Sequence, residues 1–335
     1  MRTPREALQG YRAPLWLPGG HAQTIWAAVG ARRTIGPLPV FARERWDTPD
    51  GDFIDVDLRP AADPAAPWLV LFHGLEGSSS SQYAQAFAEA AAERGWSYAV
   101  PHFRGCSGEL NRAPRAYHSG DHVEIDWILR RLRERTAQPL RVVGISLGGN
   151  ALLRWAGEQG EQAATVATSV AAVCSPLDLA AGGHAIGRGL NRQIYTRMFL
   201  RSMKPKALAK LVQHPGLFDE DRMRAARDLY EFDQLFTAPL HGFASTEDYW
   251  ARASAKPHLG RIRIPALALN ARNDPFIPAG SLPVASGVSR FVSLWQPPHG
   301  GHVGFPFGRP PGHVHTMPRA VTAWLDQPEI GVHHG

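Results

Sequence analysis

The chain has 335 residues, of which 44% are hydrophobic and 20% are charged, and its formal net charge is +6. This length suits one large domain that carries an insertion, and the composition excludes an extended disordered chain. No run of about 18 apolar residues occurs, which excludes a membrane-spanning helix. Arg and Lys are scattered along the chain, so nucleic acid is not expected as a partner.

The cysteine content and the N-terminal segment indicate the cellular setting. Only Cys106 and Cys174 occur, each in or beside an apolar stretch, and two such residues are not a disulfide framework. Residues 1–20 contain no apolar run long enough for a secretory signal. We therefore expect a reduced, cytoplasmic environment.

The first half of the chain alternates between predicted strands and helices. Residues 1–36 lack clear periodicity, and residues 41–58 alternate loosely around Asp50-Gly51, a favoured hairpin turn. Short apolar runs then predict strands at residues 68–72, 96–103, 140–145 and 166–174. Helices are predicted between them at residues 81–94, 121–136 and 147–158. Apolar strands that alternate with helices indicate an α/β fold with a mostly parallel, twisted sheet covered on both faces.

The alternation stops in the middle of the chain. Residues 176–260 show no convincing strand and read as several helices, among them 193–213 and 219–236. Strands resume at 264–270 and 290–295, and a last helix is predicted near 318–326. The sequence therefore predicts a single domain over residues 1–335, with its core at 37–175 and 261–330 and a helical lid at 176–260.

The strongest motif is Gly144-Ile145-Ser146-Leu147-Gly148, between a predicted strand and a predicted helix. It fits the G-x-S-x-G turn of α/β-hydrolases, in which the serine projects from a strained strand-to-helix turn. A side chain at either glycine would crowd that turn. The N-terminus of the following helix directs free N–H groups and a partial positive charge to the same place. Ser146 is therefore the predicted nucleophile.

Two backbone N–H groups are predicted to form an oxyanion hole. His73-Gly74-Leu75 follows directly on the strand at residues 68–72. In the α/β-hydrolase fold, this loop and the residue after the nucleophile each supply one N–H. We therefore assign the N–H groups of Leu75 and Leu147 to this role.

A serine nucleophile needs a base, and the base needs a carboxylate, in the chain order Ser, Asp, His. Asp274 comes just past the strand at 264–270, and Asp178, at another strand end, is its rival. His302 lies in a Gly-rich loop after the strand at 290–295, and His299 competes with it. The order and the strand-end placement favour a triad of Ser146, Asp274 and His302.

Several segments spread over most of the chain also carry a family resemblance. They are Gly20-His21-Ala22-Gln23-Thr24, His73-Gly74-Leu75-Glu76-Gly77, Phe103-Arg104-Gly105-Cys106-Ser107-Gly108, residues 144–150, Asn273-Asp274-Pro275-Phe276 and residues 299–305. Together they resemble the YheT-like branch of the α/β-hydrolases, which is related to the ABHD esterases and lipases of eukaryotes. The resemblance implies hydrolysis of short- to medium-chain carboxylic esters, with lipid esters or acyl transfer to an alcohol among the activities of relatives. It gives no role to His21 or Arg104, which we expect to be structural.

Three other functions compete with a serine carboxylesterase that acts on a small-molecule ester. Acyl transfer to an alcohol uses the same residues, so the sequence does not separate it from hydrolysis. A non-catalytic binding protein on a hydrolase scaffold is disfavoured by the intact triad. A metal site is disfavoured because the chain has no H-E-x-x-H and no paired Cys-x-x-Cys motif. The proposed chemistry requires no cofactor.

The predicted lid carries basic residues among apolar ones. Its basic members are Arg192, Arg197, Arg201, Lys204, Lys206 and Lys210. A basic amphipathic surface of this kind predicts weak contact with an anionic membrane surface. The alternative is a lid helix with an ordinary solvated face, and the sequence favours this alternative.

Overall fold

The structure is a computed structural model that describes residues 6, 8 and 10–334, and one nine-stranded sheet forms the centre of this part. The strand order is β1-β2-β4-β3-β5-β6-β7-β8-β9. Neighbours from β4 to β9 pair in parallel, whereas β1 and β2 form a hairpin and β2 pairs antiparallel with β4. The strands are β1 (Ala42–Asp47), β2 (Phe53–Arg59), β3 (Trp68–Phe72), β4 (Ser97–Pro101), β5 (Leu140–Ile145), β6 (Ser169–Val173), β7 (Ala266–Leu269), β8 (Val292–Trp295) and β9 (His333–His334).

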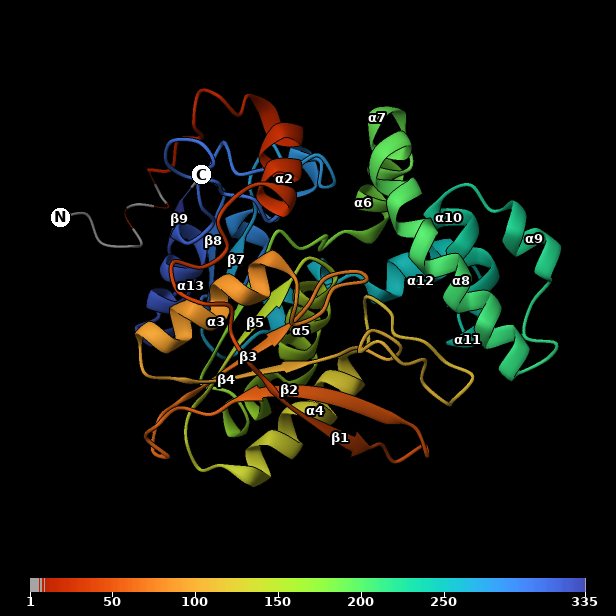
Figure 1. The fold of residues 1–335 in the computed structure, drawn as a ribbon, viewed down its shortest axis with the longest axis horizontal. Coiled ribbons are helices and arrows are strands. Elements are labelled where there is room, and N and C mark those ends of the chain that lie inside the picture. Colours follow the sequence, from red (N-terminus) through yellow and green to blue (C-terminus); the bar gives the residue numbers. More distant parts are fainter. Residues whose placement is uncertain (1–5, 7, 9, 335) are drawn as a thin grey trace.

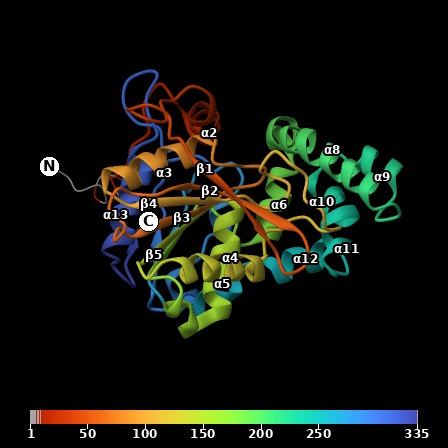
Figure 2. The same ribbon diagram turned by 60° about the horizontal axis from the view of Figure 1, so that its bottom comes forward.

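Helices cover both faces of the sheet, as the apolar strands predict (Figures 1 and 2). Side chains alternate between the faces along each strand. Leu69 and Leu71 of β3 belong to the apolar cluster under α3 and α13, and Val70 and Phe72 belong to the cluster under α4 and α5. These helices are α3 (Gln82–Glu93), α13 (Thr316–Asp326), α4 (His122–Arg135) and α5 (Leu147–Gln159).

A helical insertion separates β6 from β7. We use this name for residues 176–260, none of which lies in a strand. Its helices stand together at one end of the sheet, on the right in Figure 1. They are α6 (Leu179–Ile186), α7 (Gly189–Asn191), α8 (Arg197–Gln213), α9 (Glu220–Ala225), α10 (Leu229–Phe232), α11 (Ala238–Leu240) and α12 (Thr246–Ala253), with π-helical turns at Arg192–Thr196 and Asp233–Thr237.

One helix was not predicted, and one predicted helix is broken. The segment without periodicity contains α2 (Gly19–Val29), and the pattern misses it because two of its three buried side chains, Gln23 and Thr24, are polar. The single helix predicted at residues 219–236 is broken, because the Asp228 carboxylate accepts from the Glu231 N–H and starts α10 as a new helix. Among the described residues, no helix has both the length and the apolar character needed to cross a bilayer.

Candidate active site

Ser146 lies in the turn between β5 and α5 with a φ of +51°, a conformation that residues other than glycine rarely adopt. Its N–H donates to the carbonyl of Val173 on the neighbouring strand at 2.8 Å. A Cβ on Gly144 would lie 2.5 Å from the Gly148 oxygen, and a Cβ on Gly148 would lie 2.5 Å from the His73 oxygen. The motif therefore needs both glycines so that the strained turn can pack closely.

The structure brings Ser146, His302 and Asp274 into one chain of contacts. His302 Nε2 lies 2.9 Å from Ser146 Oγ, and His302 Nδ1 lies 2.8 Å from Asp274 Oδ2. An ionised carboxylate only accepts hydrogen bonds, so Nδ1–H donates to Asp274 and Nε2 is left to accept from the serine hydroxyl. The other Asp274 oxygen accepts from the Phe276 N–H at 2.8 Å, which fixes the carboxylate.

The rival residues lie in other positions. Asp178 caps the N-terminus of α6, where its carboxylate accepts from the Ala181 N–H and lies 3.5 Å from Lys256 Nζ. His299 is exposed at the start of the loop that carries His302. Neither residue makes a hydrogen bond to Ser146, so the geometry favours the predicted set.

The predicted oxyanion donors flank Ser146. A Cβ on Gly74 would lie 3.3 Å from Ser146 Cβ, so the loop after β3 passes directly beside the serine. The N–H groups of Leu75 and Leu147 donate to no acceptor among the described residues. Because buried N–H groups are normally paired, these two are available to a developing negative charge.

Side chains from outside this loop hold it in place. Glu76, directly after Leu75, has a φ of +56°, and its N–H donates to the Tyr117 hydroxyl at 2.9 Å. That hydroxyl in turn donates to the Glu76 carboxylate, which also lies 2.8 Å from Lys206 Nζ on α8. The helical insertion therefore reaches the proposed oxyanion loop through an ion pair.

Helix α2 holds the loop that carries His302, a role that the sequence analysis missed. Gln23 Oε1 accepts from the Gly300 N–H at 2.9 Å and from Asn273 Nδ2 at 3.0 Å. Thr24 Oγ1 accepts from the His302 N–H at 2.8 Å. These polar side chains belong to the His-Ala-Gln-Thr segment already noted in the sequence. The motif, and not hydrophobic periodicity, was therefore the feature of the sequence that could have pointed to the role of α2.

His21, from the same segment, faces the helical insertion. Its Nδ1 lies 3.1 Å from the Tyr195 hydroxyl, and the two rings are stacked. The Tyr195 ring packs edge-on against Phe276, whose own ring centroid lies 4.1 Å from that of His302. His21 therefore contacts the shell around the triad but none of the three triad side chains.

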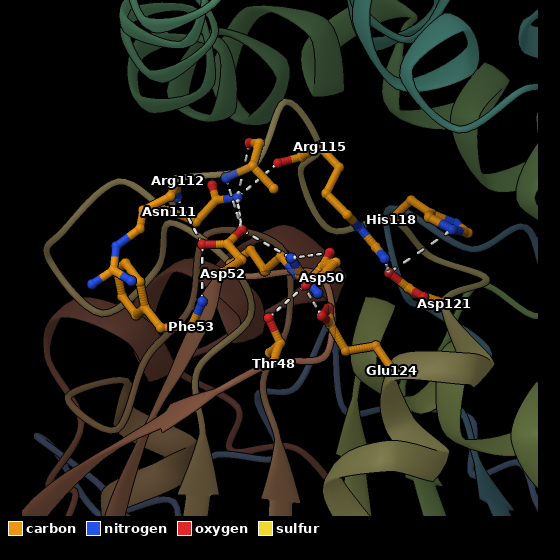
Figure 3. Close-up of polar contacts among 12 residues, drawn as sticks. Thr48, Asp50, Asp52, Phe53, Asn111, Arg112, Arg115, His118, Asp121 and Glu124 are labelled. Atoms are coloured by element: carbon orange, nitrogen blue, oxygen red, sulfur yellow. Dashed lines mark hydrogen bonds and ion pairs between the residues drawn. The ribbon is translucent and has the colours of Figure 1, made fainter.

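Arg104 lies in a buried ionic cluster. Its guanidinium lies 2.8 Å from both Asp50 and Asp52 and 2.6 Å from Glu124. Figure 3 shows this cluster between the turn of the β1–β2 hairpin and the helical insertion. Burial raises the pKa of the Glu124 carboxyl above its usual value. The cluster therefore fixes the hairpin, and Arg104 does not contact the triad.

Three connected hollows surround Ser146, and Leu75 lines all of them. The inner cavity contains Ser146 and His302 and is otherwise mostly apolar. Met203, Asp233 and Tyr249 line both this cavity and a second one, the end cavity. The third hollow, which we call the mouth, opens between α2 and the start of α8 and also contains Ser146. Apolar residues that line the inner cavity are Leu179, Ile186, Phe199, Leu229, Trp250 and Ile277.

The basic residues of the insertion do not form one solvated face. Lys206 pairs with Glu76, Lys204 Nζ donates to the Ala226 carbonyl at 2.8 Å, and Lys210 is buried. Arg192, Arg197 and Arg201 line a separate groove on the insertion, and Lys204 also reaches it. Some basic side chains of residues 192–210 thus make contacts inside the protein, and a smaller group lies in a surface groove.

Comparisons with known proteins identify the family of this chain. The sequence profile of the family described as alpha/beta hydrolase fold matches residues 67–308. "Putative esterase YheT" of Escherichia coli is 41% identical over 290 residues, which span 85% of this chain and 84% of that protein. "Phospholipase ABHD3" of Homo sapiens is 25% identical, over 93% of this chain and 79% of that protein.

A comparison of folds gives the same result. The solved structure of alpha/beta hydrolase domain-containing protein 10 from mouse aligns with a TM-score of 0.54 and 14% sequence identity. The alignment covers 86% of this chain and all of that one. At this identity the likeness concerns the fold alone. By its sequence profile and its relatives, the chain belongs to the alpha/beta hydrolase fold family, in the branch that resembles YheT.

Proposed function

We propose that the protein is a serine carboxylesterase with Ser146 as nucleophile, His302 as general base and Asp274 as the acid that orients it. The contact chain from hydroxyl to imidazole to carboxylate is the observation that carries this proposal. An adjacent base is what turns a weakly nucleophilic hydroxyl into an attacking group. The name of the YheT relative, a putative esterase, is consistent with the same chemistry.

The proposed reaction has two halves. His302 Nε2 takes the proton of the Ser146 hydroxyl as the oxygen attacks the ester carbonyl, and the N–H groups of Leu75 and Leu147 stabilise the oxyanion. The alcohol leaves with the proton held on His302 and an acyl-enzyme remains. Water then attacks the acyl group, gives its proton to His302, and releases the carboxylic acid and Ser146.

We further propose that the helical insertion acts as a lid that binds the acyl chain. Residues from α6, α8, α10 and α12 line the inner cavity, whose apolar walls suit a hydrocarbon chain. The combined inner and end cavities offer room for a short or medium chain. The alcohol part of the ester would then face the mouth.

Ester turnover tests this proposal directly. We expect hydrolysis of p-nitrophenyl butyrate, and Ser146→Ala should lower kcat by a factor of about 10⁴ or more because the nucleophile is removed. A graded series of acyl chain lengths, with Ser146→Ala protein as the blank, defines the preferred chain. Near-normal turnover by the Ser146→Ala protein would rule out the proposed nucleophile.

The rim of the mouth exposes apolar side chains. Val29 of α2 and Met198 of α8 line it and are 73% and 53% exposed. Arg192 and Arg197 lie on the same part of the insertion and could meet anionic headgroups. We propose that this rim touches membranes, and vesicle flotation tests it: binding to anionic vesicles alone is expected, and no binding to either anionic or neutral vesicles would remove the idea.

A further inference from the structure

One carboxylate lines both cavities of the proposed acyl site. Asp233 lines both the inner cavity and the end cavity, at the place where the two meet. It opens the π-helical turn Asp233–Thr237, a rare backbone form that is frequent at functional sites. None of the proposed catalytic steps uses Asp233, so its position calls for a separate explanation.

The contacts of Asp233 leave part of its capacity to accept hydrogen bonds unused. Its Oδ1 accepts from the Thr237 hydroxyl at 2.6 Å, and its Oδ2 accepts from Trp250 Nε1 at 3.0 Å. An ionised carboxylate can accept about four hydrogen bonds, so two acceptor positions remain. In the described part of the chain, no Lys, Arg or His nitrogen lies within 4.0 Å of these oxygens.

Such a carboxylate is costly unless something pairs with it. Burial raises its pKa to about 6, which reflects the cost of holding the charge among apolar side chains. Two donors from the protein lower that cost only partly. A further donor supplied by a bound molecule in the cavity would lower it more, because hydrogen bonds to a charged group are stronger than neutral ones.

We propose that Asp233 is a specificity residue that accepts a hydrogen bond from a hydroxyl group on the acyl chain of the substrate, so that the preferred esters are those of hydroxylated fatty acids. This inference rests on the proposed function, since it assumes that the acyl chain fills the inner cavity. A hydroxyl fits better than an ammonium group because the cations Arg104, Lys206 and Lys210 line the same end cavity and would repel a further positive charge.

Paired substrates test the proposal. The substrates are ethyl octanoate and ethyl octanoates that carry one hydroxyl at successive positions in the distal half of the chain, with release of the acid measured by chromatography. For the native protein we expect kcat/KM for at least one hydroxylated isomer to exceed that for ethyl octanoate by about tenfold. Asp233→Leu should abolish this preference, so that the two kcat/KM values become about equal, and Asp233→Asn, which keeps shape and one acceptor, should give an intermediate preference.

A control variant separates specificity from a general effect on the insertion. Asp228→Asn changes a carboxylate that caps α10 and does not line the cavities. It should leave the ratio of kcat/KM for the hydroxylated isomer to kcat/KM for ethyl octanoate unchanged. Equal turnover of all isomers by the native protein, or a preference that persists in Asp233→Leu, would overturn the inference while the esterase proposal stands. No hydrolysis of any ester above the Ser146→Ala blank would instead overturn the proposed function.

Discussion

The carboxyl edge of the sheet and the helical insertion above it are built in different ways. At the sheet edge, Ser146, Asp274 and His302 each sit at a strand end, and backbone hydrogen bonds and close glycine packing hold them. The insertion consists of short helices, two π-helical turns and large hollows. The difference suggests that the sheet edge sets the chemistry, whereas the insertion sets which ester fits.

The largest expected effect belongs to the sheet edge. Asp274→Asn should lower kcat by about 10⁴, because an amide can no longer hold His302 in the tautomer that accepts the serine proton. Asp178→Asn, the matched change at the rival carboxylate, should alter kcat less than about twofold because that side chain caps α6 and faces Lys256, away from Ser146. Steady-state kinetics on one p-nitrophenyl ester measures both, and the opposite ranking would assign the acid to Asp178.

Loss of the support from α2 should have the next largest effect. Thr24→Val keeps the shape of the side chain but removes the oxygen that accepts from the His302 N–H. A displacement of the imidazole by a fraction of an ångström should lower kcat by about 10²-fold, with KM nearly constant. Thr24→Ser restores the oxygen and should recover most of the rate. If Thr24→Val were as active as the native protein, α2 would have no part in positioning His302.

The two regions should also respond to pH with opposite signs. Burial lowers the pKa of His73, beside the sheet edge, to about 3 and raises that of Asp233, in the insertion, to about 6. Neutral His73 stabilises the fold above its unfolded pKa of about 6.5, and about 2 kcal/mol of this is lost by about pH 5. Protonated Asp233 stabilises the fold below its unfolded pKa, and about 3 kcal/mol is lost as the pH rises from about 4 to 7.

Denaturant unfolding at several pH values separates these contributions. His73→Gln should reduce the loss of stability on acidification, and Asp233→Asn should reduce the loss on the way to neutral pH. Both variants remove a titrating group and keep a hydrogen-bonding side chain. Identical pH profiles for the native protein and both variants would contradict the burial of these two groups.

The smallest expected effect concerns the preference for the length of the acyl chain. Met203 lies at the junction of the inner and end cavities, so Met203→Trp should narrow the passage and lower kcat/KM for a long-chain ester about tenfold relative to a butyrate ester. Met198→Trp, the matched change at the exposed mouth, should leave this ratio unchanged. A change in the ratio for Met198→Trp alone would move the acyl chain to the mouth.

The sequence predicted the sheet better than the insertion, for physical reasons. The predicted strands at residues 68–72 and 140–145 coincide with β3 and β5, because strands buried on both faces are continuous apolar runs. Helix α2 was missed because it buries Gln23 and Thr24 for their hydrogen bonds. The hollows around Asp233 depend on packing between distant helices, which no local pattern records.

The three predicted side chains of the site lie in contact, but their surroundings came from the structure. G-x-S-x-G and the order Ser, Asp, His are local motifs with fixed positions in the fold. The contacts of Thr24 with the His302 loop and of Lys206 with Glu76 join segments far apart in the chain. Such pairs become visible only when the fold brings them together.

Labelling with a fluorophosphonate probe tests the central claim most directly, because the probe reacts covalently with a serine only when a neighbouring base activates it. We predict one label per chain, on the peptide that contains Ser146, and none on the Ser146→Ala protein. A native protein that hydrolyses esters but takes no label at Ser146, or a label retained in Ser146→Ala, would contradict the account.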